Sequence, residues 1–337
     1  MPQHSLATHV VLLLIPQVIS VGINIFCKQA IVGDSMPVSI LISYRFICGA
    51  ITLSPFVIFY ESRISAPTKP TWKLLCISVV NGLLGGSLFQ NLYLESMAST
   101  SPTFISAIVN LTPAIAFLLC LAFRLESLSA QRHPKIKVAG VALSIVGATL
   151  LASFKRLEVN PWPLKFGFLQ QQQQQKHDNQ IMGLILALLS TLSNAFFLTI
   201  QGKFNVDSGN IFLVPFLINL MAAIQSVVYA LLAEKDKTQW KLGWNVRLWA
   251  ASFAGVLGSG LSTTITTWCI SEMGPLFVST ANPFGLILMT ATGYFLLGEK
   301  LYVTSLAAIA LIVAAVLLIL WGEVKEQEVE LDAVSEA

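Results

Sequence analysis

The stretch Gly82-Leu83-Leu84-Gly85 is followed, 173 residues later (255 − 82 = 173), by Gly255-Val256-Leu257-Gly258. The same shift, without a gap, places Pro102-Thr103-Phe104 on Pro275-Leu276-Phe277. We interpret this agreement as an internal duplication. Each copy contains an odd number of apolar stretches, and an odd unit inserted twice in series lies in a bilayer in opposite orientations. The duplication therefore predicts inverted repeats, an architecture of many secondary transporters.

Composition places most of the chain in lipid. The sequence is 55% hydrophobic and 11% charged, with a mean hydropathy of +0.73, whereas about a quarter of the residues in soluble domains are charged. We expect an all-α polytopic membrane protein with ten transmembrane helices, arranged as two inverted five-helix repeats. The predicted spans, each about 20 residues long and able to cross roughly 30 Å of hydrocarbon, are 8–29, 37–59, 73–94, 102–123, 136–154, 181–201, 211–233, 247–270, 275–297 and 302–321.

The duplication also divides the chain into parts. The first repeat is predicted at 8–154 and the second at 181–321, joined by a connector at 155–180 that contains a glutamine run, and followed by an acidic tail at 322–337. Lys and Arg residues favour the cytoplasmic side of a membrane. Those that follow the second and fourth spans predict that both termini are cytoplasmic, although a basic cluster after the seventh span favours the opposite orientation.

Several classes of function are disfavoured by the sequence. The net charge of +3 and the lack of basic runs interleaved with aromatics argue against a nucleic-acid partner. The chain has no G-x-x-x-x-G-K-[ST] phosphate loop and no H-E-x-x-H helix, so neither ATP-driven transport nor metalloprotease chemistry is expected. We expect no enzyme activity, no metal and no cofactor. All acidic residues fall outside the middle of the spans, which favours facilitative or bidirectional movement over proton coupling.

Polar side chains at membrane depth are expensive and are therefore functional candidates. Pro113 and Pro283 lie about half a membrane inside the fourth and ninth spans, where each is predicted to interrupt its helix and shape a cavity. Arg45 and Lys28 are candidate charge partners, and Arg45 would bind either an anion or an acidic side chain. Six residues are predicted to line a substrate-binding cavity: Asn24, Gln90, Asn110, Asn194, Thr264 and Asn282.

Several motifs resemble those of the plant nodulin-like EamA transporters, the walls-are-thin-related members of the drug/metabolite transporter superfamily. The motifs are Phe89-Gln90-Asn91-Leu92-Tyr93, Ser101-Pro102-Thr103-Phe104, Asn282-Pro283 and Leu320-Trp321-Gly322. The resemblance implies two five-helix EamA repeats around a central cavity. It also implies movement of amino acids, or of auxin in some members, across a plant plasma membrane or vacuolar membrane. Ser193-Asn194-Ala195 and Thr263-Thr264-Ile265-Thr266 depart from the family pattern toward small polar groups.

These observations predict a secondary transporter that moves glutamine-like zwitterions by alternating access. Its expected partners are a small-molecule substrate and the lipid bilayer, and its expected location is the plasma membrane, with the vacuolar membrane as the alternative. A carrier of auxin or another organic anion is the alternative within transport. A membrane receptor or scaffold without flux, with the acidic tail as a docking segment, is the alternative from another class.

Overall fold

The computed structural model describes residues 6–61, 71–123, 134–152, 158–159, 180–203, 211–273, 278, 281–296, 301–303, 306–318 and 321. The first half of the chain forms α1 (Leu6–Lys28), η1 (Gln29–Gly33), α2 (Val38–Glu61), α3 (Trp72–Asn81), η2 (Gly82–Ser87), α4 (Leu88–Ser99), α5 (Pro102–Val109), α6 (Thr112–Ala122) and α7 (Pro134–Ala152). The second half forms α8 (Gln180–Lys203), α9 (Leu213–Ala233), η5 (Lys237–Trp240), α10 (Val246–Phe253), η6 (Ala254–Ser262), α11 (Thr263–Met273), α13 (Asn282–Phe295) and the helix Leu306–Leu318. The elements η1, η2 and η6 are π-helical, and η5 is a short 3-10 helix.

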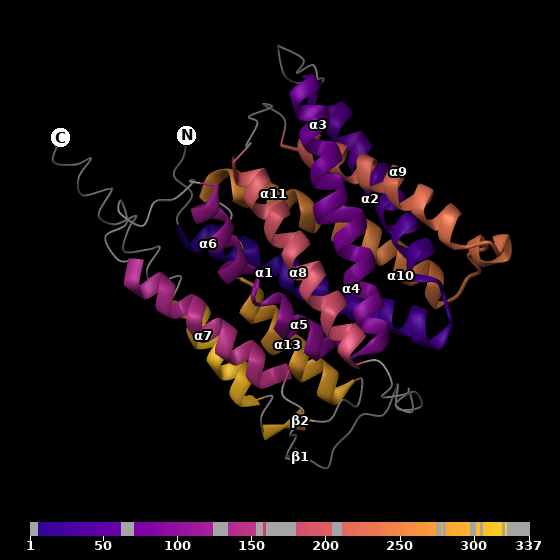
Figure 1. The fold of residues 1–337 in the computed structure, drawn as a ribbon. Helices are drawn as coiled ribbons and strands as arrows, with labels where there is room; N and C mark the ends of the chain where they lie inside the picture. Colours follow the sequence, from indigo (N-terminus) through magenta and orange to yellow (C-terminus); the bar gives the residue numbers. More distant parts are fainter. Residues whose placement is uncertain are drawn as a thin grey trace, which may run out of the picture.

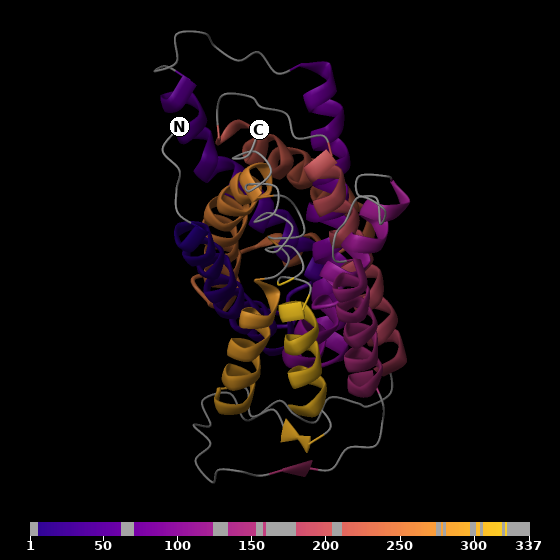
Figure 2. The same ribbon diagram turned by 90° about the vertical axis from the view of Figure 1, so that its left-hand side faces the viewer.

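The helices form one bundle, with a small bridge of strands at one end (Figures 1 and 2). Within the described residues, seven helical runs are long and apolar enough to cross a membrane: Val11–Gly33, Val38–Tyr60, Trp72–Ser99, Pro102–Leu119, Ile181–Lys203, Leu213–Ala233 and Val246–Glu272. Three shorter apolar helices, Val138–Gly147, Phe284–Phe295 and Leu306–Leu318, fall within the other predicted spans. The prediction of a helical, polytopic membrane protein is confirmed. The described residues also contain a short element that is not helical, the antiparallel pairing of β1 (Glu158–Val159) with β2 (Leu301–Tyr302).

Some predictions concern segments that the structure does not describe. Of the predicted connector at 155–180, only Glu158, Val159 and Gln180 lie within the described residues. The predicted tail at 322–337 lies outside them. Pro102, by contrast, is described, and it begins α5 as its sequence context predicts. The hydroxyl of Ser101 caps that helix by accepting a hydrogen bond from the Phe104 N–H at 3.2 Å.

Helices α2 and α9, which the duplication makes equivalent, pack side by side in opposite directions (Figure 1). Near the start of α2, the Ser39 hydroxyl donates to the carboxylate of Glu234, which caps the end of α9, at 3.5 Å. At the other end of α2, the rings of Phe56 and Tyr60 lie 5.6 and 5.8 Å from the ring of Phe212, which precedes α9. The two helices are therefore antiparallel.

Glycines at equivalent positions of the duplication mark close approaches between helices. A Cβ atom on Gly82 would lie 3.0 Å from the Cβ of Met221 in α9, and a Cβ atom on Gly255 would collide with Cys48 in α2. The shift of 173 relates the two contacts, because it takes Gly82 to Gly255 and Cys48 to Met221. Small residues of this kind let membrane helices approach closely. The same contact thus occurs twice: a glycine of η2 meets α9, and the equivalent glycine of η6 meets α2.

The remaining core helices fall into two groups, according to whether they pack mainly on α1 or mainly on α8. Helix α1 packs against α10, η6, α11 and α13, and we name this group bundle A. Helix α8 packs against α3, η2, α4, α5 and α6, and we name this group bundle B. The shift of 173 takes each group to the other, since it relates α1 to α8 and Gly82 of η2 to Gly255 of η6. Each bundle therefore combines helices from both halves of the chain.

Both predicted helix interruptions are present. Helix α5 ends at Val109, and α6 resumes at Thr112 with Pro113 as its second residue. Helix α13 begins at Asn282 with Pro283 as its second residue. Proline is tolerated in the first turn of a helix because its missing N–H is not needed there. Each interruption therefore precedes its proline, and it leaves an asparagine, Asn110 or Asn282, at the break.

Candidate substrate cavity

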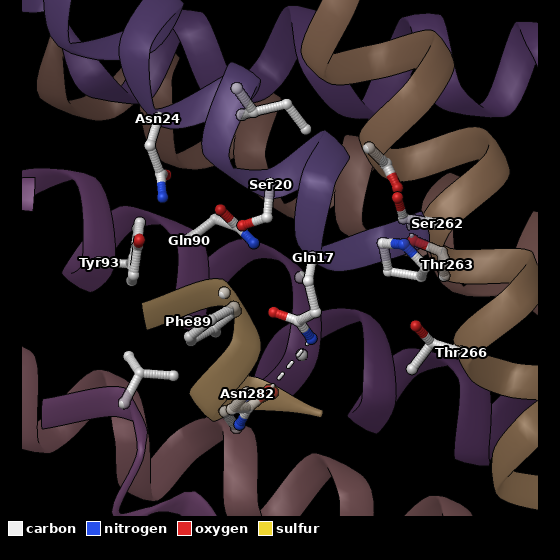
Figure 3. A pocket seen from close by; sticks show the side chains of 18 of the residues that line it. Gln17, Ser20, Asn24, Phe89, Gln90, Tyr93, Ser262, Thr263, Thr266 and Asn282 are labelled. Atoms are coloured by element: carbon white, nitrogen blue, oxygen red, sulfur yellow. Dashed lines mark hydrogen bonds between the residues drawn. The ribbon is translucent and has the colours of Figure 1, made fainter. Parts of the chain in front are cut away.

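A cavity of about 250 Å³ lies between bundles A and B, with α2 and α9 completing its wall. Its lining includes side chains from α1, α2, α4, α5, α8, α9, η6, α11 and α13. Figure 3 shows Ser20 and Asn24 of α1 pointing toward Gln90 and Tyr93 of α4, with Thr263 and Thr266 of α11 on the other side. The lining combines neutral polar side chains with apolar ones. Drug-sized ligands occupy pockets of about 300–1,000 Å³, so this cavity suits a small substrate.

The structure brings most of the predicted site residues together. Those that line the cavity are Asn24, Gln90, Asn110, Asn194, Asn282 and Arg45. Thr264 does not line the cavity, and its hydroxyl donates to the carbonyl of Gly260 in the preceding turn at 2.8 Å. Its neighbours Thr263 and Thr266 line the cavity instead. The role of all these residues in binding stays a prediction.

The other predicted residues lie away from the cavity or are only partly described. Pro113 is buried at the start of α6 and does not line the cavity, and the side chain of Pro283 lies outside the described part of the structure. The Lys28 ammonium lies one helical turn beyond Asn24. It donates to the carbonyls of Met97 and Thr100, at 2.7 and 2.9 Å. Lys28 is thus a partner of the end of α4 and is not among the residues that line the cavity.

Arg45 supplies the cavity with its charge. The Arg45 Nη1 atom donates to Gln90 Oε1 at 2.8 Å, and its Nε atom donates to Ser259 Oγ at 3.1 Å. The Asn219 amide donates to the Ser259 carbonyl at 2.7 Å and so holds η6 in place beside α9. Among the described residues Arg45 has no acidic partner, and it is the single charged side chain of the lining. Whether Arg45 binds an anion stays a prediction.

Two asparagines of the lining have acceptor oxygens without a hydrogen-bond donor. The Asn110 amide nitrogen donates to the Ser106 carbonyl at 2.7 Å, while its Oδ1 atom has no partner. The Oδ1 atom of Asn219 is likewise unpaired and buried. Buried polar atoms in native proteins nearly always have a partner. These two oxygens would accept N–H donors such as those of an amide or an ammonium group.

Several lining residues were not predicted, among them Gln17, Ser20, Tyr93 and Ser262. The Gln17 amide donates to Asn282 Oδ1 at 3.4 Å and so connects α1 with α13 across the cavity (Figure 3). A signal for Gln17 was available in the sequence. Residues seven apart lie on the same face of an α-helix, and Gln17 precedes Asn24 by seven. In the described part of the chain, no group of three or more His, Cys, Asp or Glu residues could hold a metal ion.

Comparison with known proteins agrees with this architecture. Residues 8–153 match the EamA-like transporter family. Two WAT1-related proteins of Arabidopsis thaliana are each 30% identical to the chain. One aligns over 326 residues, which is 95% of this chain and 90% of the relative, and the other over 324 residues, which is 94% and 90%. The chain belongs to the WAT1-related family of EamA-like transporters.

Membership of the WAT1-related family makes the chain a membrane transporter of the drug/metabolite superfamily, with a small molecule as its substrate. A solved crystal structure gives independent support for the fold. It superposes on 90% of this chain and 97% of its own with a TM-score of 0.54, at 16% sequence identity. At that identity, the likeness concerns the fold alone. The substrate of this WAT1-related transporter must therefore be argued from its cavity.

Proposed function

We propose that the chain is a ten-span carrier, built from two inverted five-helix repeats, that moves glutamine-like amino acids by facilitative or bidirectional alternating access. The observation that carries the proposal is the cavity of about 250 Å³ between bundles A and B, lined by amides, hydroxyls and the guanidinium of Arg45. A carboxylate placed on Arg45 forms charge-assisted hydrogen bonds, which are about twice as strong as neutral ones. The unpaired oxygens of Asn110 and Asn219 would accept from the ammonium or amide of the same substrate.

The arrangement of the helices supports the transport cycle. The cavity lies at the interface between two bundles that the duplication relates, so rocking one bundle against the other would expose it to alternate sides of the membrane. The antiparallel packing of α2 against α9 supports the inverted orientation of the repeats. We place the protein in the plasma membrane, or alternatively the vacuolar membrane, with both termini in the cytoplasm.

A second candidate is a carrier of organic anions such as auxin. It is favoured by the charge of the cavity, because the described lining contains Arg45 and no acidic side chain to bind the ammonium of an amino acid. Aromatic rings also line the cavity, from Phe46, Phe89 and Phe197. A planar carboxylate such as indole acetate would place its charge on Arg45 and its ring against these side chains. Competition between labelled glutamine and labelled indole acetate in one vesicle preparation decides between the two substrates.

The proposed site is tested by replacing the asparagines at the two helix interruptions. Asn110→Leu and Asn282→Leu are each expected to reduce counterflow of the labelled substrate in liposomes by about tenfold to a hundredfold, since losing the partner of a buried polar group costs on the order of 1–3 kcal/mol. The matched control is Asn91→Leu. Asn91 is an amide on α4 that donates to the Ser87 carbonyl of its own helix at 2.7 Å and does not line the cavity.

Unchanged counterflow in both the Asn110 and the Asn282 variants would remove this site assignment. Counterflow absent from the unaltered protein, for amino acids and organic anions alike, would instead favour a receptor or scaffold. Asn91→Leu is expected to transport normally, which separates loss of the site from a general effect of removing an amide.

A further inference from the structure

Lys28 connects bundle A to bundle B at one end of the cavity. It is the last residue of α1, and its ammonium donates to two carbonyls at the end of α4, those of Met97 and Thr100. The end of a helix carries partial negative charge, so a cation there is stabilising. Helix α1 belongs to bundle A and α4 to bundle B. The contact therefore holds the two bundles together on one face of the molecule, which we name the Lys28 face.

The duplication gives Lys28 an equivalent on bundle B. The shift of 173 takes Lys28 to Gln201 of α8 (28 + 173 = 201), and it takes Met97 and Thr100 to Ile270 and Met273 at the end of α11. Gln201 is 6% exposed, and neither its Nε2 nor its Oε1 atom has a hydrogen-bond partner. The contact that is made at Lys28 is therefore not made at the equivalent position.

The two positions lie on opposite faces of the protein. Helix α8 begins where α4 ends, because the Ser96 hydroxyl of α4 donates to the Gly183 carbonyl of α8 at 2.7 Å. Gly183 of α8 thus lies near the Lys28 face. Gln201 is 18 residues farther along α8 (201 − 183 = 18), or about 27 Å at 1.5 Å per residue. It lies at the far end of the bundle, which we name the Gln201 face.

Gln201 is also close to the end of α11. Leu198, one turn before Gln201, belongs to the same buried apolar cluster as Ile270 and Cys269 of α11. Helices α8 and α11 are therefore in contact near Gln201. Helix α8 belongs to bundle B and α11 to bundle A. Both positions therefore lie where one bundle meets the other, at opposite ends of the same cavity.

The helix faces that line the cavity continue into both contacts. On α1 the lining residues Gln17 and Asn24 lead to Lys28, and on α8 the lining residues Asn194 and Phe197 lead to Gln201. Such spacings of three, four and seven residues keep side chains on one side of a helix. A substrate that left the cavity along either of these helix faces would pass one of these two residues.

We propose that Lys28 and Gln201 are the two halves of an alternating latch. While Lys28 binds the end of α4, the Lys28 face is closed and Gln201 is unpaired. When the bundles rock, the Lys28 contact opens and the Gln201 amide donates to the carbonyls at the end of α11. The latch rests on the proposed alternating access. Because a cation binds helix-end carbonyls more strongly than an amide does, the two halves are unequal, and the transporter rests with its Lys28 face closed.

Two native cysteines report on the two faces. Cys27 adjoins Lys28 and Cys269 adjoins Ile270, and both are fully buried in the structure. We would keep one of them in a chain whose other cysteines are replaced by alanine, and measure its rate of reaction with a small maleimide in the purified full-length protein. Lys28→Gln is expected to raise the labelling rate of Cys27 about tenfold, through loss of one charge-assisted contact. It is expected to lower the labelling rate of Cys269.

Gln201→Lys acts on the opposite face and provides the second variant. It strengthens the contact between position 201 and the end of α11. Like Lys28→Gln, it is therefore expected to raise the labelling rate of Cys27 and lower that of Cys269. Lys28→Arg keeps the cation and is the matched control, with labelling near that of the unaltered chain. Opposite changes at the two cysteines support the latch even if no flux is found, in which case only the transport proposal fails. Labelling that rises at both cysteines together, or changes at neither in both variants, overturns the latch.

Discussion

Gly86→Leu is expected to reduce the accumulation of folded protein strongly, and by more than Gly86→Ala does. A Cβ atom on Gly86 would lie 2.5 Å from the Cβ of Ala222, with the Phe46 ring 3.5 Å away, so there is no space for a larger side chain between η2 and α9. Overpacking of a close-packed interior typically costs about 1–3 kcal/mol and more where the backbone must move. The measurement is the monodisperse fraction after detergent extraction.

The matched control for Gly86 is Gly243→Leu. Gly243 is an exposed loop residue whose added Cβ would meet only the Asn245 side chain, at 3.7 Å and beyond. This variant is expected to give the same monodisperse fraction as the unaltered chain. Comparable loss in both variants would show that the extraction assay responds to any added leucine, and the predicted close contact would then have no support.

A milder pair of substitutions tests whether the contact itself is responsible. Gly86→Ala is expected to destabilise the protein by about 1–3 kcal/mol, and adding Ala222→Gly is expected to recover most of that loss. The equivalent contact in the second repeat already has the exchanged residues, because Ser259 and Gly49 correspond to Gly86 and Ala222. There, a Cβ atom on Gly49 would lie 2.5 Å from the Ser259 Cβ. In each repeat, one glycine accommodates one small side chain.

Among the described residues, seven of the ten predicted spans coincide with helical runs long and apolar enough to cross a membrane, because hydropathy is a local property. Each predicted span contains helix, and the start at Pro102 follows from the residues on either side of it. Proline chemistry likewise located both helix interruptions. These features depend on neighbouring residues alone, so the sequence was sufficient to predict them.

The rotation of a helix about its axis was harder to predict. Thr264 follows the π-helical η6 (Ala254–Ser262), in which each turn contains more residues than an α-helical turn. The helical phase changes along η6, so regular α-helical spacing gives the wrong face for residues beyond it. As a result, Thr263 and Thr266 line the cavity and Thr264 does not. The contact between Lys28 and α4 could not be predicted from the sequence either. Met97 and Thr100 accept its hydrogen bonds through backbone carbonyls, which every residue has.

Arg45→Met is expected to reduce uptake of carboxylate substrates by about thirtyfold or more, because truncating one partner of a hydrogen-bonded charge pair costs roughly 2–5 kcal/mol. Initial uptake rates into liposomes, measured over a range of substrate concentrations, are the readout. Arg45→Lys keeps the positive charge and loses the planar fork that binds a carboxylate through two parallel hydrogen bonds. We expect uptake of this variant to lie between those of the methionine variant and the unaltered transporter.

A loss of uptake in Arg45→Met must be separated from damage to the cavity, since Gln90 and Ser259 also lose the hydrogen bonds that Arg45 donates. Substrate charge provides that separation. If the guanidinium binds a carboxylate, a substrate in which a neutral amide replaces that carboxylate lacks the interaction already in the unaltered protein. The Arg45 substitution then has no such interaction to remove. In the Arg45→Met variant, uptake of indole acetamide, or of glutamine whose α-carboxylate is converted to an amide, should then fall much less than uptake of the parent acids. Equal loss for acids and amides would show that Arg45 supports the cavity wall and does not select the charge of the substrate.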